Sequence, residues 1–337
     1  MNEEKLAATA SAIVSHGKGI LAADESTPTM AKRMAQIGQD NTETNRRDFR
    51  QALFETADLE QFISAVILFE ETLDQVTEDG RRLPAILESK GIIPGIKVDQ
   101  GAHPMEQAPS EKLTKGLDGL HERCVRYHSL GARFAKWRAV ITIGEGIPTD
   151  ACIQANAAAL AQYARICQDA GLVPIVEPEV LMDGAHTIEG CYEISEKTFT
   201  IVFDALAAAG VHLPGILLKP NMVVSGKDCP EQAGIDQIAE FTLKCLSASV
   251  PEPVPGIVFL SGGQSEKEAT RNLNAINSQG TYPWALSFSF GRALQQSALH
   301  AWNGKNANIP ATQAALRHRA KMSSKASLGT YSPELEV

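Results

Sequence analysis

The sequence predicts an α/β fold, a single (β/α)8 barrel, from three observations. Eight short apolar runs alternate with segments of helical periodicity along 337 residues, a pattern typical of parallel strands joined by helices. Polar residues in successive runs are almost evenly spaced: Lys136 and Glu177 are 41 residues apart, and Lys219 follows Glu177 by 42. No linker rich in Pro, Gly or Ser divides the chain. Eight such units predict a closed barrel.

The apolar runs that predict strands are short and mostly end in charged residues, glycine or proline. In chain order they cover residues 19–26, 62–73, 92–99, 132–141, 172–181, 215–224, 255–263 and 284–290. Helices are predicted where apolar residues recur at helical spacing before a glycine stop or another break. These segments are 3–16, 29–58, 111–131, 150–170, 187–210, 235–250 and the one that follows Gly291. The alternative is an open, doubly wound sheet, which is weakened because the first turn has no GxGxxG motif.

Composition narrows the class of protein. The chain is 44% hydrophobic and 21% charged, which is ordinary for a globular enzyme. Its net charge of −9 argues against nucleic-acid and anionic-membrane partners. Six cysteines without a CxxC pair fit a reducing compartment, and neither a signal peptide nor a membrane span is evident. We expect a cytoplasmic protein with one domain over 1–337 and a short C-terminal tail of about 324–337.

Lys219 is the candidate nucleophile because it ends an apolar strand, in the segment GILLKPNM (215–222). Burial disfavours the charged form of an amine, so a lysine in an apolar wall tends to lose its proton. The neutral amine is a nucleophile for carbonyl carbon. The alternative is a lysine just past the strand end whose ammonium reaches water.

Charged residues of other strands are expected to converge on this lysine. Alternate residues of a strand share a face, so Lys136 and Arg138 point the same way. Glu177 and Glu179 do so on the next strand. Barrels place their chemistry at the carboxyl ends of the strands. The mouth would then gather seven charged side chains: Asp24, Lys97, Lys136, Arg138, Glu177, Glu179 and Lys219. Neighbouring cations lower the pKa of a lysine and a carboxylate can move protons, which suits imine chemistry on a ketone.

Two loops predict phosphate binding. Barrels of this class commonly bind phosphate at the loops after the seventh and eighth strands, next to a helix N-terminus. Serine, glycine and arginine stand there in FLSGGQS and SFSFGR: Ser261, Gly262, Gly263, Ser289, Gly291 and Arg292. The eight histidines show neither HxH nor HExxH spacing, so no metal site is predicted.

Seven motifs in this order resemble those of class I (Schiff-base) fructose-bisphosphate aldolases: GKGILAADES, GIKVDQG, FAKWR, IVEPE, LLKPNM, FLSGGQS and SFSFGRALQ. The resemblance extends over about residues 5–333. It implies a TIM barrel that reversibly cleaves fructose 1,6-bisphosphate to dihydroxyacetone phosphate and glyceraldehyde 3-phosphate, a carbon–carbon lyase of glycolysis and gluconeogenesis. It also implies phosphorylated ketose and triose substrates and a cytoplasmic homotetramer. No metal or cofactor is implied.

The resemblance also implies a role for each catalytic candidate. Lys219 matches the Schiff-base lysine, and Glu177 matches the general acid and base that serves carbinolamine formation and dehydration. Asp24 matches the aspartate that acts at the C4 hydroxyl during cleavage. Lys136 matches a lysine that lowers the pKa of Lys219, and Glu179 matches a second glutamate that pairs with the lysines.

Substrate-binding residues fall into two groups by the same resemblance. The two serine–glycine loops with Arg292 match the 1-phosphate site, and Arg138 is the companion of Lys136. Arg33, Ser26 and Lys97 match residues of the family that lie near the second phosphate of the substrate. Alternatives with the same chemistry are sedoheptulose 1,7-bisphosphate or fructose 1-phosphate as substrate. A different class of function is a secondary, non-catalytic scaffold role.

Overall fold

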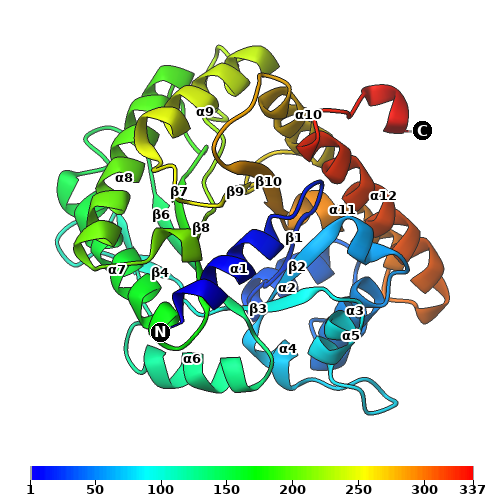
Figure 1. Cartoon of the computed structure of the whole chain (residues 1–337). Coiled ribbons are helices and arrows are strands. Elements are labelled where there is room, and N and C mark those ends of the chain that lie inside the picture. Colours follow the sequence, from blue (N-terminus) through cyan, green and yellow to red (C-terminus); the bar gives the residue numbers. More distant parts are fainter. Residues whose placement is uncertain (1, 337) are drawn as a thin grey trace.

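The chain forms a closed barrel of eight parallel strands, seen from one end in Figure 1. The computed structural model describes residues 2–336. The barrel strands are β1 (Gly19–Ala23), β2 (Ile63–Leu68), β3 (Ile93–Lys97), β6 (Phe134–Ile141), β7 (Val173–Val180), β8 (Leu217–Leu218), β9 (Gly256–Phe259) and β10 (Ala285–Phe290). They follow one another around the barrel in chain order, and β10 pairs with β1 to close it. The predicted fold and all eight predicted strands are confirmed.

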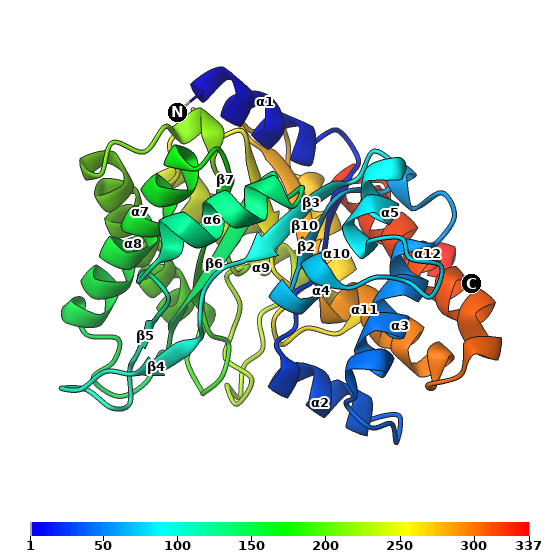
Figure 2. The same cartoon turned by 90° about the horizontal axis from the view of Figure 1, so that it is seen from below.

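Helices surround the barrel and cover its outer face (Figure 1). They are α1 (Glu3–Ile13), α2 (Thr27–Ala35), α3 (Glu43–Phe54), α4 (Glu70–Asp74), α5 (Leu83–Ser89), α6 (Leu120–Ser129), α7 (Asp150–Asp169), α8 (Ile188–Ala208), α9 (Ile235–Ser249), α10 (Glu266–Asn277), α11 (Arg292–Trp302) and α12 (Ile309–Ser327). Helix α1 differs from most of them because it lies across one end of the barrel, and α2 lies at the opposite end (Figure 2). Leu6, Ala10 and Ile13 of α1 belong to the same apolar cluster as the barrel interior.

The prediction of one helix over 111–131 is wrong in its first part. Residues Lys112–Thr114 form strand β5, which pairs antiparallel with β4 (Ala102–Pro104). Gly116 and Gly119 have positive φ values of 125° and 62°, a backbone conformation that an α-helix excludes. Helix α6 therefore begins only after Gly119. The hairpin β4–β5 lies at the end of the barrel opposite α1 (Figure 2).

Two other boundaries differ from the prediction. The segment 29–58 is divided into α2 and α3, and Gly38 with φ 64° lies in the turn between them. Helix α12 extends to Ser327, so the predicted C-terminal tail begins later than residue 324.

Among residues 2–336, no helix combines the length and apolar character that crossing a membrane requires.

Side chains alternate along the strands between two apolar layers. Phe134, Ile175 and Leu217 lie in the barrel interior, whereas Ala135, Val176 and Leu218 pack in the layer beneath the helices. This alternation confirms the predicted orientation. Lys219 continues β8 by one residue, since its backbone N–H donates to the Val176 carbonyl at 2.8 Å. Its side chain therefore enters the barrel mouth.

A buried arginine joins the last helices to the C-terminal segment. Arg319 on α12 is only 3% exposed. Its guanidinium pairs with the Glu336 carboxylate at 2.6 Å and donates to the Thr270 hydroxyl on α10 at 2.7 Å. It also donates to the Glu266 carbonyl at 3.1 Å. One side chain thus links α10, α12 and the 3-10 helix Pro333–Glu336.

We expect the Arg319→Met substitution to lower the free energy of unfolding by about 3 kcal/mol, because it leaves a carboxylate and a hydroxyl without their buried partner. Urea unfolding measures this change. The matched control is Arg317→Met, two residues away, whose pair with Asp58 is about half exposed and which should change stability by about 0.5 kcal/mol or less. Equal effects of the two substitutions would contradict the role given to Arg319.

Candidate active site

One pocket of about 930 Å³ is lined by residues at the carboxyl ends of the barrel strands. These strand ends lie at the end of the barrel opposite α1 (Figure 2). This is where barrels of this class place their chemistry. All fifteen residues predicted for the site line it: Asp24, Ser26, Arg33, Lys97, Lys136, Arg138, Glu177, Glu179, Lys219, Ser261, Gly262, Gly263, Ser289, Gly291 and Arg292. The residues predicted for the site therefore lie around a single pocket.

Lys219 lies at the base of this pocket and is only 4% exposed. Its Nζ is 3.3 Å from Oε1 of Glu177. Burial lowers the pKa of Lys219, and the nearby charge of Lys136 acts in the same direction against the opposing carboxylates of Glu177 and Asp24. The result is an amine that releases its proton more easily than an ordinary lysine.

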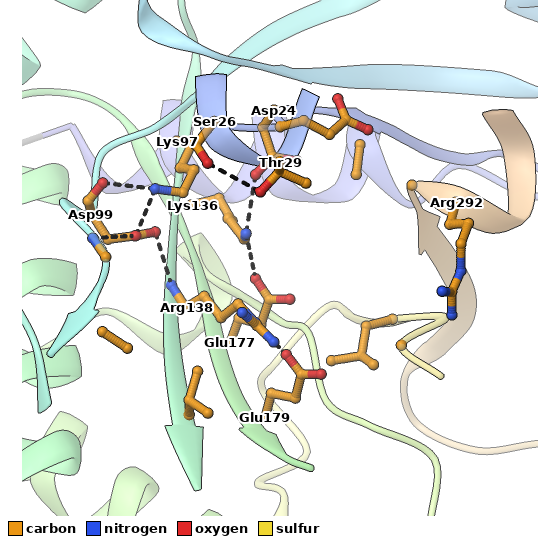
Figure 3. A pocket seen from close by; sticks show the side chains of 18 of the residues that line it. Asp24, Ser26, Thr29, Lys97, Asp99, Lys136, Arg138, Glu177, Glu179 and Arg292 are labelled. Atoms are coloured by element: carbon orange, nitrogen blue, oxygen red, sulfur yellow. Dashed lines mark hydrogen bonds and ion pairs between the residues drawn. The ribbon is translucent and has the colours of Figure 1, made fainter. Parts of the chain in front are cut away.

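Glu177 lies between two lysines. Its other oxygen, Oε2, is 2.8 Å from Nζ of Lys136, which also pairs with Oδ2 of Asp24 at 3.1 Å (Figure 3). Burial opposes ionisation of Glu177, but the charges of Lys136, Lys219 and Arg138 outweigh it and lower its pKa. Burial of Asp24 is likewise outweighed, chiefly by Lys136, and its pKa is lowered to about 2. Both carboxylates are therefore ionised in the free pocket.

Lys136 is held in its charged form by the same contacts. Burial lowers its pKa, but the carboxylates of Asp24, Glu177 and Asp99 more than reverse this and raise the pKa above the ordinary value. Lys136 is thus a fixed positive charge, and Lys219 is the lysine of the pair that can become neutral. The second glutamate, Glu179, pairs closely with Arg138 and not with a lysine.

The two serine–glycine loops meet at one side of the pocket. A Cβ on Gly263 would lie 1.7 Å from Sδ of Met182, and Gly263 has φ 76°, so a side chain there is excluded. Ser289 is 1% exposed, and its hydroxyl has no hydrogen-bond partner among the described residues. Arg292 begins helix α11. Glycine backbone, a free hydroxyl and a helix N-terminus are together suited to an anion.

Of the three residues predicted near a second phosphate, Arg33 lies away from Lys97. Nη2 of Arg33 is 3.0 Å from Glu25 and would be 3.7 Å from a Cβ on Gly291, so Arg33 lies beside the first group of loops. Lys97 lies across the pocket from Arg292 (Figure 3). Ser26 contacts Thr29, with 3.1 Å between their hydroxyl oxygens.

Two buried carboxylates of the pocket are absent from the predicted site residues, Glu25 and Asp99. Glu25 forms an ion pair with Arg33 and accepts a hydrogen bond from Gln295 at 2.9 Å. Asp99 binds Lys97. Both belong to motifs in which a different residue was predicted for the site: Asp24 in ADES and Lys97 in GIKVDQG. Their closeness in sequence to these residues could have identified them. No group of three or more His, Cys, Asp or Glu side chains within residues 2–336 is arranged to hold a metal ion.

The chain is closely similar to known aldolases over its whole length. Residues 5–337 match the family described as fructose-bisphosphate aldolase class-I. A probable fructose-bisphosphate aldolase class 1 of Xanthomonas axonopodis pv. citri is 52% identical over 332 residues, with 98% of this chain and 99% of the relative covered. Fructose-bisphosphate aldolase 2 of Plasmodium berghei is 54% identical over 330 residues, which are 97% of this chain and 89% of that one.

A solved structure agrees with the sequence relatives. The fructose-bisphosphate aldolase of Plasmodium falciparum, in complex with TRAP and a small-molecule inhibitor, superimposes with a TM-score of 0.97 at 50% identity. The match covers 98% of this chain and 96% of that one. This chain therefore belongs to the class I fructose-bisphosphate aldolase family, as its motifs predict.

Proposed function

We propose that Lys219 forms the Schiff base through which this class I aldolase cleaves fructose 1,6-bisphosphate to dihydroxyacetone phosphate and glyceraldehyde 3-phosphate. The observation that carries the proposal is the buried contact between Lys219 and Glu177, 3.3 Å long, beside the permanent charge of Lys136. It combines an amine of lowered pKa with a carboxylate that can take its proton.

The first step is a proton exchange within this contact. Lys219 passes a proton to Glu177, and the neutral amine attacks the C2 carbonyl of the substrate. Glu177 gives this proton to the former carbonyl oxygen, which forms the carbinolamine. Glu177 then takes a proton from the carbinolamine nitrogen and gives it to the hydroxyl, which leaves as water. The product is an iminium on Lys219, and Glu177 is again a carboxylate. Atoms and charge balance without a further acid.

Carbon–carbon cleavage follows from the iminium, which draws the electrons of the C3–C4 bond and becomes an enamine. The C4 hydroxyl must lose its proton as the aldehyde forms, and we assign Asp24 as the acceptor. Asp24 is ionised, with a pKa of about 2, and Lys136 holds its Oδ2 at 3.1 Å. Protonation of the enamine at C3 and hydrolysis of the iminium then release dihydroxyacetone phosphate.

The phosphates are assigned to opposite sides of the pocket. Ser261, Gly262, Gly263 and Ser289, together with Gly291 and Arg292, would bind the 1-phosphate. Lys97 and Ser26 would contact the other phosphate. Arg33 is also assigned to this second phosphate. Because it lies beside Gly291, it is near the residues assigned to the 1-phosphate as well. Glu179 would hold Arg138 at the pocket wall by their close ion pair.

The remaining proposals concern the whole protein. We propose that the chain acts as one domain, as a cytoplasmic homotetramer, without a metal or cofactor and without nucleic-acid or membrane partners. Plant relatives named as cytosolic or cytoplasmic, from Arabidopsis thaliana and Pisum sativum, support the location. Turnover on sedoheptulose 1,7-bisphosphate and fructose 1-phosphate measures the substrate preference.

The Schiff base can be tested by reduction with borohydride in the presence of dihydroxyacetone phosphate. We expect a covalent adduct on the peptide that contains Lys219, located by mass spectrometry and undiminished by EDTA. Lys219→Met should abolish it, and Lys197→Met, which removes a surface lysine paired with Asp150, should not. An adduct that persists in Lys219→Met would refute the assignment.

The charge of Lys136 should set the pH dependence of that reaction. Because Lys136 acts to lower the pKa of Lys219, Lys136→Met should raise it, and the half-maximal pH of borohydride trapping should move upward by about one unit. Lys136→Arg keeps the charge and should leave this pH nearly unchanged. A downward shift, or the same shift in both variants, would contradict the electrostatic role of Lys136.

A further inference from the structure

The loop after β3 contains a buried carboxylate, Asp99, that takes no proton in the aldol steps proposed above. Its side chain is 3% exposed although it lines the pocket. Burying a carboxylate is unfavourable unless charged and N–H groups surround it. Asp99 therefore requires a structural explanation, and its hydrogen bonds supply one.

The first set of contacts fixes Lys97. The ammonium of Lys97 donates to Oδ1 of Asp99 at 2.6 Å and to the Asp99 carbonyl at 2.8 Å. Figure 3 shows Lys97 turned toward Asp99 at the side of the pocket away from Arg292. Two of the three ammonium protons are thus used, and the third remains for a ligand.

The second set of contacts fixes the backbone around Lys97. Oδ1 of Asp99 also accepts from the N–H of Gly101 at 3.1 Å, and Oδ2 accepts from the N–H of Arg138 on β6 at 3.3 Å. The ladder between β3 and β6 ends just before this point, where Val98 donates to the Lys136 carbonyl at 3.0 Å. The carboxylate continues the pairing of the two strands beyond their last backbone hydrogen bond.

We propose that Asp99 is a positioning residue for the second phosphate of the substrate. It holds Lys97 and the strand ends beside it in the arrangement that binds an anionic group distant from the reacting carbonyl. A flexible ammonium fixed before binding loses less freedom when the ligand arrives. This inference rests on the proposed function, since it takes Lys97 as a ligand of that phosphate.

The negative charge of Asp99 does not cancel this effect. Both carboxylate oxygens accept from Lys97 or from backbone N–H groups, and the side chain is almost completely covered. Its charge is therefore directed toward the protein, whereas Lys97 is 16% exposed toward the pocket. Positioning outweighs repulsion in this geometry.

Two substrates separate this role from a general structural one. Fructose 1,6-bisphosphate carries the second phosphate and fructose 1-phosphate lacks it. Asp99→Asn should raise KM for the bisphosphate about tenfold, the effect of weakening one charge-assisted contact. KM for fructose 1-phosphate should change by less than about twofold, and kcat on that substrate should be retained.

Further variants define the control and the link to Lys97. Glu111→Gln removes another buried carboxylate, which is 2% exposed and accepts from the N–H and the hydroxyl of Thr149 at 2.7 Å each; it should leave both KM values unchanged. Lys97→Met should raise KM for the bisphosphate selectively, and the double variant with Asp99→Asn should be no worse than Lys97→Met. If Asp99→Asn does not fold, Asp99→Ser provides the same comparison.

The proposal is overturned if KM for both substrates rises equally, if KM for the bisphosphate is unchanged or falls, or if the two substitutions are additive. Borohydride trapping on Lys219 distinguishes this failure from failure of the proposed function. Trapping should persist in Asp99→Asn, and its absence from the unmodified protein would reject the Schiff base whatever Asp99 does.

Discussion

The site depends on one constraint, that charges buried in a barrel mouth must be paired. Glu177 is 3% exposed and Lys136 and Lys219 are each 4% exposed, so none of them can be hydrated as in water. Glu177 is therefore shared by two lysines, and Asp24 completes the charge balance around Lys136. The pairing keeps Lys136 charged and leaves Lys219 as the amine whose pKa is lowered. Catalytic asymmetry between two chemically identical side chains thus arises from their neighbours alone.

Barrel geometry makes this pairing possible. Parallel strands end at one rim, and the register of β6 against β7 places Arg138 opposite Glu177. Residues more than a hundred positions apart in the chain, such as Asp24 and Lys136, come within 3.1 Å. The interior below them is filled by Phe134, Ile175 and the first helix, so the charged layer rests on an apolar floor.

The fold was largely predictable because strand period, apolar runs and glycine stops are local signals. The β4–β5 hairpin was not, since its residues are polar and its pairing is held by contacts outside the segment, such as Asn156 on the Lys112 carbonyl. The site residues could likewise be identified by position and motif, but their partners could not. Nothing in the sequence distinguishes which glutamate binds Lys136 and which binds Arg138, because this depends on the register between β6 and β7. Asp99 was missed for the same reason: its role is visible only once β3 and β6 lie side by side.

The pairing of the central charges also limits how an acidic protein can attract an anionic substrate. Each buried lysine at the centre faces a carboxylate, so the central charges largely cancel and contribute little attraction at a distance. We therefore assign the binding of the phosphates to groups outside this centre. Arg292 forms no ion pair with a carboxylate among the described residues, and the hydroxyl of Ser289 is unpartnered. Under the proposed function, reaction and anchoring are separated in space: the paired charges around Lys219 would perform the chemistry, and Arg292 and Ser289 would hold a phosphate and so orient the substrate toward Lys219.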